Sequence, residues 1–266
     1  MSGKWKAISC IIIISLLLSS CMPKDGKVKD QETSSSLVTP VSSGYQVEEV
    51  EYEKDGISAT YPRIVSGAPE DKLKVWNEII EKDFNKILQI YSFNPFPELK
   101  PTSAAPPIIL NINNEVKINN GRFFSVLYTA AYNSKYSAHP SELVYTTNID
   151  MENSKRLTFS DIIKLDANFV NFIKKGDFIS SAKENKELNA AIKDYISQLS
   201  NQELINGFKS ADIIGGGNEY GIFTYLTPEK LGISLSVPNY LGDHIEIERP
   251  YSELSDFMKI NVNPDK

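Results

Sequence analysis

Histidine and cysteine, which carry much of enzyme chemistry, are scarce in this chain of 266 residues: it has only His139, His244, Cys10 and Cys21. Neither histidine belongs to a His-Glu-x-x-His pattern or to a run of clustered metal ligands. The sequence has no Gly-x-Ser-x-Gly elbow, and no Gly-Lys-Ser/Thr follows the three glycines at 215–217, as a phosphate-binding loop requires. We therefore expect no metal, no cofactor and no catalytic residue of these kinds.

A long apolar run is missing too. The longest one, residues 7–18, is interrupted by Ser9 and Ser15. It is shorter than the roughly 20 residues that a membrane-spanning helix needs. Lys4 and Lys6 precede it, and small residues follow it. This order of a basic start, a short apolar segment and small residues is typical of an export signal, which we predict over residues 1–20.

The end of this signal, Leu18-Ser19-Ser20-Cys21, resembles the lipobox of bacterial lipoproteins. The resemblance implies that Cys21 is lipidated and becomes the first residue of the mature chain. Fatty acyl chains, at roughly 0.8 kcal/mol per buried methylene, would then hold the protein on the extracytoplasmic face of the cell membrane. Cys10 would leave with the signal, so that no disulfide could form within the mature chain. An ordinary cleavable signal and an uncleaved anchor are the alternatives.

The mature chain has an excess of acidic side chains. Removal of Lys4 and Lys6 with the signal changes the formal net charge from −6 to −8. A surface of this sign repels nucleic acid and attracts cationic proteins. We therefore expect no nucleic-acid partner.

Residues 21–44 have few large apolar side chains, and we predict that they form a disordered tether. Apolar residues then alternate over 45–62 around Asp55-Gly56, which predicts a β-hairpin. Helical spacing of apolar residues predicts an amphipathic helix from about Ala68 to Tyr91. Trp76 on this helix is either a packed core side chain or a platform for a sugar ring.

Strand-like segments dominate the middle and the end of the chain. They are expected over 108–150 and 221–249, with capping boxes at Thr158 and Ser200 in the helical region between them. A short helix is expected around 252–258. This order predicts an α+β fold in which antiparallel sheets or meanders pack against a few helices, as one compact unit or two small subdomains. Alternate apolar residues over 124–132 form either part of the core or a sugar platform.

Several short motifs over residues 123–257 occur in an order that resembles the RsiV-type domain. The family pattern is a Gly-Gly-Ala-His-Pro turn, a strand ending in Asn-x-Asp, a Leu-Thr-(Leu/Phe)-x-Asp helix start, a late pair of strands and a closing Pro-Tyr-x-x-Leu. The matching positions here are Ala138-His139-Pro140, Asn148 and Asp150, Leu157-Thr158-Phe159 with Asp161, Leu226-Thr227, and Pro250-Tyr251 with Leu254. The segment over 47–91, with Tyr61-Pro62 and the long helix, resembles the N-terminal part of a PdaC-type domain.

Two segments depart from the family pattern. Tyr136-Ser137 stands where the family has paired glycines, and the short stretch between Val237 and His244 keeps only Tyr240 and Gly242. The resemblance implies a PdaC-type segment over 45–118 and an RsiV-type domain over 119–260. RsiV-type domains sense lysozyme, and in polysaccharide deacetylases this domain type accompanies a separate catalytic domain. The resemblance therefore implies recognition outside the membrane, with these ligand-binding candidates: His139, Tyr136, Asn148, Asp150 and Tyr240.

The chemistry of individual residues leaves several hypotheses open. His139 is a structural hydrogen-bonding residue of a turn, a ligand contact, or a metal or catalytic residue, and the proline after it favours extended backbone. Glu246 and Glu248 form either a solvated strand face or, given a matching cleft, a glycosidase pair. We hypothesise a lipid-anchored protein that binds a lysozyme-like protein or cell-wall glycan (peptidoglycan) without catalysis. The alternatives are a cell-wall hydrolase or deacetylase that uses His139, Asp150 or Glu246, and a structural envelope component.

Overall fold

The computed structural model describes residues 44–91, 108–134, 137–176, 185–215 and 221–262. All of them belong to one compact unit, which comprises residues 41–266. Within these ranges, no helix is both long enough and apolar enough to cross a membrane. Cys21 and Tyr136 lie outside the described residues, as do most of the predicted tether and the proline-rich segment over 92–107.

The chain enters the fold through the predicted hairpin. Strand β1, Gln46–Lys54, pairs antiparallel with β2, Ile57–Ser66. Asp55 and Gly56 between them have φ angles of 51° and 85°. A two-residue hairpin turn requires this left-handed conformation, which glycine adopts freely and aspartate tolerates. The hairpin that Asp55-Gly56 predicts is thereby confirmed.

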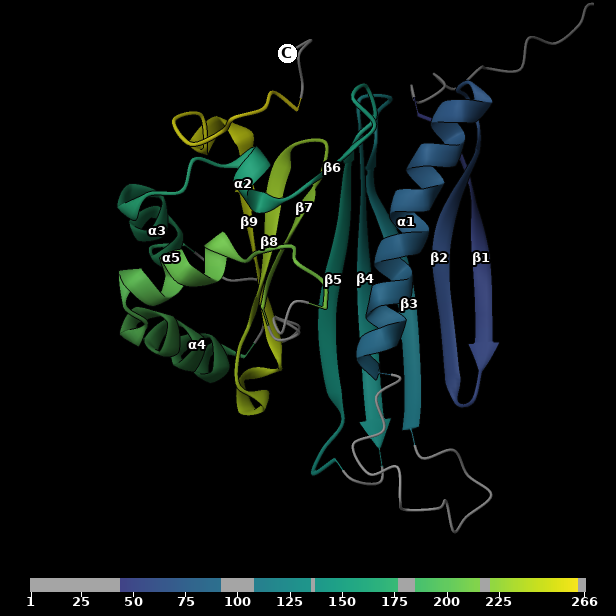
Figure 1. Cartoon of the computed structure of the whole chain (residues 1–266). Helices are drawn as coiled ribbons and strands as arrows, with labels where there is room; N and C mark the ends of the chain where they lie inside the picture. Colours follow the sequence, from purple (N-terminus) through teal and green to yellow (C-terminus); the bar gives the residue numbers. More distant parts are fainter. Residues whose placement is uncertain (1–43, 92–107, 135–136, 177–184, 216–220, 263–266) are drawn as a thin grey trace, which may run out of the picture. The chain divides into compact units, whose positions relative to one another are not determined.

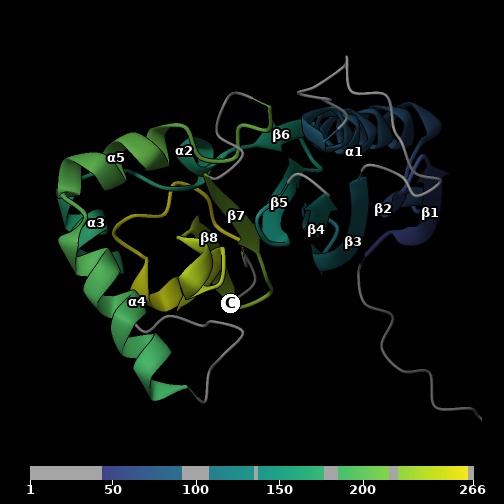
Figure 2. The ribbon, with the colours of Figure 1, turned by 90° about the horizontal axis from the view of Figure 1, so that it is seen from below.

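Helix α1, Glu70–Tyr91, follows the hairpin as predicted. In Figure 2 it lies over one face of the large sheet. Its buried stripe includes Ile80 and Phe84, and burial of a side chain of this kind contributes about 1.5–3 kcal/mol. Trp76 is 1% exposed, and its indole Nε1 donates to the Ser154 hydroxyl at 3.0 Å. Trp76 is therefore a core residue, and its ring is not available to a sugar.

Six strands form the large sheet, in the order β1-β2-β3-β4-β5-β6 (Figure 1). The four further strands are β3 Ile108–Asn119, β4 Phe123–Ser134, β5 Ser141–Asp150 and β6 Lys155–Leu157. β2 and β3 pair in parallel, and the other neighbours pair antiparallel. Alternate residues of β4, from Phe124 to Tyr132, pack in the same core as α1. This stripe is therefore core and not a sugar platform.

A smaller sheet and the remaining helices complete the fold. The helices are α2 Phe159–Ile162, α3 Ala167–Lys174, α4 Lys186–Gln198 and α5 Asn201–Lys209. The strands are β7 Ile222–Leu226, β8 Lys230–Ser236 and β9 His244–Pro250, paired antiparallel in that order. Figure 2 shows the helices around this sheet. Phe159, Phe169 and Phe208 pack with one face of the small sheet in a second hydrophobic core.

These elements confirm the predicted α+β class, with mostly antiparallel sheets packed against helices. The side chains of β5 and β7 meet where the sheets join: the rings of Tyr145 and Phe223 lie 5.1 Å apart. The predicted division between residues 118 and 119 falls inside β3, at its last two residues, and β3 pairs with β4. The domain limits themselves stay a prediction.

The terminal segment differs from the prediction. In place of a helix over 252–258, a single 3-10 turn, η2 Tyr251–Glu253, is followed by turns. The segment then pairs with the exit of α2: Met258 forms a bridge with Ile163, and the Lys259 amide donates to the Ile162 carbonyl at 2.8 Å. Backbone groups that a helix would use internally are thus bonded to a distant segment. The predicted terminal helix is wrong for this reason.

Candidate functional site

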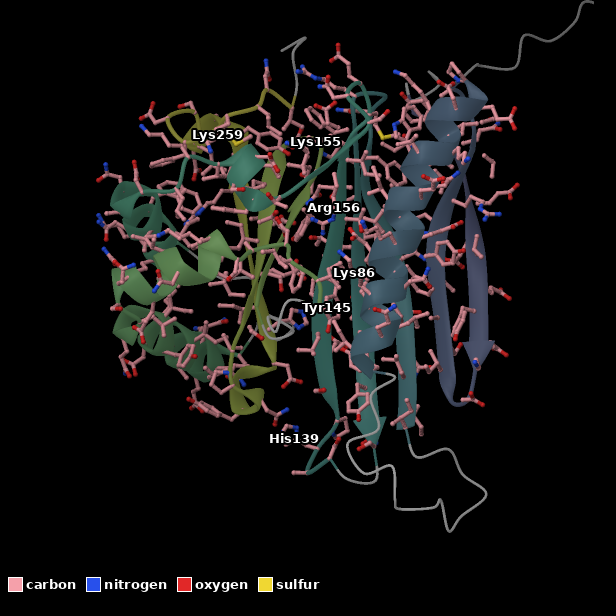
Figure 3. The ribbon with its side chains drawn as sticks, in the orientation of Figure 1. Lys86, His139, Tyr145, Lys155, Arg156 and Lys259 are labelled. Atoms are coloured by element: carbon pink, nitrogen blue, oxygen red, sulfur yellow. The ribbon has the colours of Figure 1, made fainter. Side chains whose placement is uncertain are left out.

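His139 lies in the turn between β4 and β5, at the lower end of the molecule in Figure 3. The residue is exposed, and its Nδ1 lies 3.1 Å from the carbonyl oxygen of Pro140. On the other side of the turn, the Ser137 amide donates to the Ser134 carbonyl at 3.0 Å. His139 thus has a local backbone contact, which matches the structural interpretation, while its exposed ring stays open to a ligand.

Asn148 and Asp150 lie at the opposite end of β5. The ten residues of this strand, at about 3.3 Å each, separate them from His139. Asn148 is fully buried: its Oδ1 accepts from the Ser125 hydroxyl at 2.6 Å, and its Nδ2 donates to the Thr224 carbonyl at 2.7 Å. Asp150 accepts from the amide and side chain of Asn153 in a local turn. Asn148 therefore joins the two sheets, and the structure does not bring either residue near His139.

Tyr240 lies in the 3-10 turn η1, Asn239–Leu241, which connects β8 and β9. Its side chain is 74% exposed, whereas Leu241 beside it is 1% exposed and anchors the turn in the second core. The Asn239 Nδ2 donates to Asp243 Oδ1 at 3.0 Å and fixes the other end of the turn. The turn thus holds a large aromatic side chain in solvent on an anchored backbone.

A hollow of about 540 Å³ brings the turn of His139 together with the connection that bears Tyr240. We call it the terminal hollow. Three segments contribute its walls: the end of β4 with the His139 turn and the start of β5, the β8–β9 connection, and helix α4 through Tyr195. The lining residues are Tyr132, Ser137, Ala138, His139, Ser141, Leu143, Tyr195, Ser236, Val237, Pro238, Asn239 and Asp243. The volume falls in the usual range of small-molecule sites, roughly 300–1,000 Å³.

Two side chains of the β8–β9 connection fix the wall of the terminal hollow. Within the described residues, β5 pairs with β6 only from Asn148 to Asp150, so its first half lacks a strand neighbour on that side. There the Glu142 amide donates to Asp243 Oδ2 at 2.9 Å, and the His244 Nδ1 lies 3.3 Å from the Glu142 carbonyl oxygen. Asp243 and His244 therefore contact the backbone of β5 at Glu142, where a neighbouring strand would pair, and hold the connection against β5.

Glu246 and Glu248 meet at the hydroxyl of Tyr225 and do not form a solvated strand face. The Tyr225 hydroxyl lies 2.5 Å from Glu246 Oε2 and 3.2 Å from Glu248 Oε1. Burial, followed by the bond to Glu246, raises the pKa of Tyr225. Burial opposes ionisation of Glu248, but the bond from Lys230 at 3.0 Å, the charge of Lys230 and the bond from Tyr225 together outweigh it and lower the pKa of Glu248. Both glutamates therefore provide hydrogen-bond acceptors for the hydroxyl group of a buried tyrosine.

Gly232 makes this arrangement possible. It lies opposite Tyr225 on β8, and a Cβ added to it would stand 2.0 Å from the Tyr225 ring. Only a glycine lets the ring lie against the strand and extend its hydroxyl to β9. The strand spacing of the two acids indicates that they share a face, but nothing in the sequence pairs them with a tyrosine.

A second buried network, missed at the sequence level, joins α1 to both sheets. Arg156 Nε donates to the carboxylate of Asp83, and Arg156 Nη2 donates to the Asp212 carbonyl at 2.8 Å (Figure 3 labels Arg156). The Asp212 carboxylate accepts from the Thr224 amide and hydroxyl, both at 2.6 Å. Burial raises the pKa of Asp212, although Thr224 and Arg156 act in the opposite direction. This network is structural, because every member bonds within the fold.

A larger hollow, of about 770 Å³, lies between the start of η2 and the segment Met258–Val262. It contains none of the predicted ligand-binding residues. The Lys259 ammonium at its wall already donates to the Ser160 carbonyl at 2.7 Å. We therefore take the terminal hollow as the candidate site, since it joins His139 to the turn of Tyr240. No group of three or more metal-binding side chains occurs in the part of the chain that the structure describes.

Comparison with known proteins shows a similarity of fold alone. No family model and no curated protein matches the sequence. The fold is similar to that of solved structures described as DUF3298 family proteins. One is a crystal structure from Pseudomonas aeruginosa PAO1, with a TM-score of 0.50 and 14% identity, covering 85% of this chain and 99% of that chain. The other is from Bacteroides fragilis NCTC 9343, with a TM-score of 0.47, 11% identity and coverage of 83% and 96%.

Proposed function

We propose that this protein is a lipid-anchored extracytoplasmic protein that binds a ligand in the terminal hollow without catalysing a reaction. Cys21 would carry the anchor, and residues 21–44 would connect it to the folded unit. The ligand is a lysozyme-like protein or a cell-wall glycan, the two classes that the sequence resemblance implies.

The terminal hollow is the observation that carries this proposal. It has the volume of a ligand site, and it lies between the two segments that contain the ligand-binding candidates His139 and Tyr240. Its ionisable groups support binding and not chemistry. Asp243 bonds to Glu142 and Asn239, and His139 lacks the paired base or acid that proton transfer needs within the described residues.

Titration calorimetry of the full-length chain in detergent, against lysozyme and against soluble peptidoglycan fragments, tests the proposal. We expect one of the two ligands to bind at low salt, where attraction between the acidic protein and a cationic partner is strongest. Ala138→Trp should weaken that binding by about tenfold or more, which corresponds to roughly 1.4 kcal/mol, because the indole fills the hollow from an exposed position.

The matched control is Ala167→Trp, which adds the same indole to an exposed alanine at the start of α3. It should bind as the wild type does. Absence of binding to both ligands at low salt, or equal affinity of Ala138→Trp and wild type, would contradict the proposal. Release of sugar fragments or acetate during the titration would favour the hydrolase or deacetylase alternative.

A further inference from the structure

The terminal hollow combines an apolar part with a polar part. Leu143 and Val237, which are 4% and 8% exposed, contribute aliphatic surface, and Tyr132 contributes an aromatic ring. Three serines also line the hollow: Ser137, Ser141 and Ser236. The Ser137 hydroxyl lies 3.0 Å from the Ser134 hydroxyl, and the Ser236 hydroxyl donates to the Asp243 carbonyl at 3.4 Å. A ligand that fits both parts must have a small apolar group together with several hydrogen-bonding groups, because a buried polar group without a partner costs free energy.

The charges around the hollow favour an uncharged ligand. Among its described lining residues none is lysine or arginine, so an anion finds no cationic partner. Asp243 is the one carboxylate, and its two oxygens accept from Glu142 and Asn239 at 2.9 and 3.0 Å. A cationic ligand would have to compete with both bonds. The lining thus offers an anion no lysine or arginine, and a neutral ligand, unlike an ammonium group, leaves both Asp243 bonds in place.

An exposed aromatic residue belongs to the β8–β9 connection, which lines this hollow. Tyr240 directly follows the lining residue Asn239, and its ring is 74% exposed on a turn that Leu241 and Asp243 anchor. Exposed aromatic rings on a fixed backbone bury apolar surface at little cost in conformational entropy, and a tyrosine also offers a hydroxyl. The apolar face of a pyranose ring is complementary to such a surface.

We infer that the terminal hollow takes an uncharged N-acetylated amino sugar at or within a glycan chain. The acetamide methyl occupies the aliphatic part near Leu143 and Val237, the amide and hydroxyl groups bond to the serine hydroxyls and Asn239, and a sugar ring packs on Tyr240. This inference rests on the proposed function, and it names the ligand class of the same site.

Three trisaccharides that differ at one substituent provide the test, by calorimetry of the full-length chain in detergent. Chitotriose with all three N-acetyl groups should bind. Its deacetylated form, which bears ammonium groups, and cellotriose, which bears hydroxyl groups, should each bind about tenfold or more weakly. Equal affinity for the acetylated sugar and cellotriose would overturn the role of the acetamide group.

Substitutions at Tyr240 test the ring contact separately. Tyr240→Ala should weaken binding of the acetylated trisaccharide by about tenfold, while Tyr240→Phe keeps the ring and should retain most of the affinity. Ile213→Ala is the matched control, because it removes another exposed apolar side chain, 46% exposed. Both positions are exposed, so the three variants should fold. Unchanged affinity of Tyr240→Ala would overturn the placement of the sugar.

The outcomes for the ligand class and for the site are distinguishable. If lysozyme binds, Ala138→Trp blocks it and no trisaccharide binds, the sugar inference fails and the proposed function stands. If neither lysozyme nor any glycan binds, both fail. If the acetylated trisaccharide binds and Ala138→Trp abolishes binding, both are supported.

Discussion

At the scale of single residues, two arginines each bind a carboxylate of helix α1 in different surroundings. Arg63 reaches Glu81 at 2.8 Å near the surface, where the two side chains are 48% and 36% exposed. Arg156 binds Asp83, whose side chain is only 1% exposed. Removal of an arginine from an exposed pair leaves a carboxylate in water, whereas removal from the buried pair leaves a charge in the core.

The replacement of Arg156 should therefore cost much more stability than that of Arg63. We expect Arg156→Met to lower the free energy of unfolding by about 3 kcal/mol and Arg63→Met to lower it by less than about 1 kcal/mol. Urea denaturation followed by the fluorescence of Trp76 measures both, because Trp76 lies in the core on the same helix. Equal losses in the two variants would contradict a structural role for the buried network.

Some residues of the candidate site can be predicted from the sequence, and others cannot. Short family motifs mark the turns of His139 and Tyr240, but the two turns belong to different sheets, so the motifs do not show that the turns meet. Asn148 and Asp150 stand in the same motifs but serve a buried joint and a local turn. Asp243 and Tyr195 reach the hollow through the packing of α4 and the β8–β9 connection, which no local pattern encodes. Whether any of these residues binds a ligand stays a prediction.

At the scale of elements, the start of α2 depends on one carboxylate. Asp161 accepts from the Thr158 amide and hydroxyl, both at 2.9 Å, and from Lys155. Burial alone would raise the pKa of Asp161, but these bonds outweigh it and lower the pKa. The folded protein thus binds this proton less readily than the unfolded chain. The stabilisation from Asp161 is complete above the unfolded pKa and is lost as pH falls through the lowered folded pKa.

Asp161→Ala should therefore destabilise the protein in a pH-dependent way. At pH 7 we expect a loss of about 1 kcal/mol, typical of a helix cap. The difference from the wild type should shrink as the pH falls from about 4, near the unfolded pKa of aspartate. Urea titrations at several pH values measure it. Asp256→Ala, at an exposed aspartate outside a helix start, should cost little at any pH, and a constant loss for Asp161→Ala would contradict the assignment.

Local patterns predicted most elements because their signals lie within the element. Asp55-Gly56 fixes the first hairpin, and the capping boxes at Thr158 and Ser200 mark the starts of α2 and α5. The prediction of a terminal helix was wrong because the segment has a distant pairing partner. Phe257 and Met258 pair with the segment directly after α2, which lies far earlier in the chain. A sequence window around 252–258 contains no signal of that partner.

At the scale of the whole molecule, the two sheets are joined by polar contacts as well as by apolar packing. The Ser125 hydroxyl accepts from the Leu226 amide at 3.1 Å and donates to Asn148, which in turn donates to Thr224. If the two sheets separated slightly, these buried groups would lose their hydrogen bonds, and no water could replace them. The bonds therefore favour one arrangement of the two sheets. The terminal hollow lies at the other end of β5, where Asp243 of the β8–β9 connection bonds to the Glu142 amide.

The proposed anchor belongs to the whole molecule too, and it can be tested in cells that express the full-length chain. With an alkyne-bearing palmitate analogue, the wild-type protein should be labelled and recovered with membranes, because two or more acyl chains give stable attachment. Cys21→Ser should be unlabelled, while Cys10→Ser, within the predicted signal, should be labelled as the wild type is. Labelling of Cys21→Ser would place the lipid elsewhere. An unlabelled wild-type protein that stays with membranes at its full uncleaved length would instead indicate an apolar anchor formed by residues 7–18.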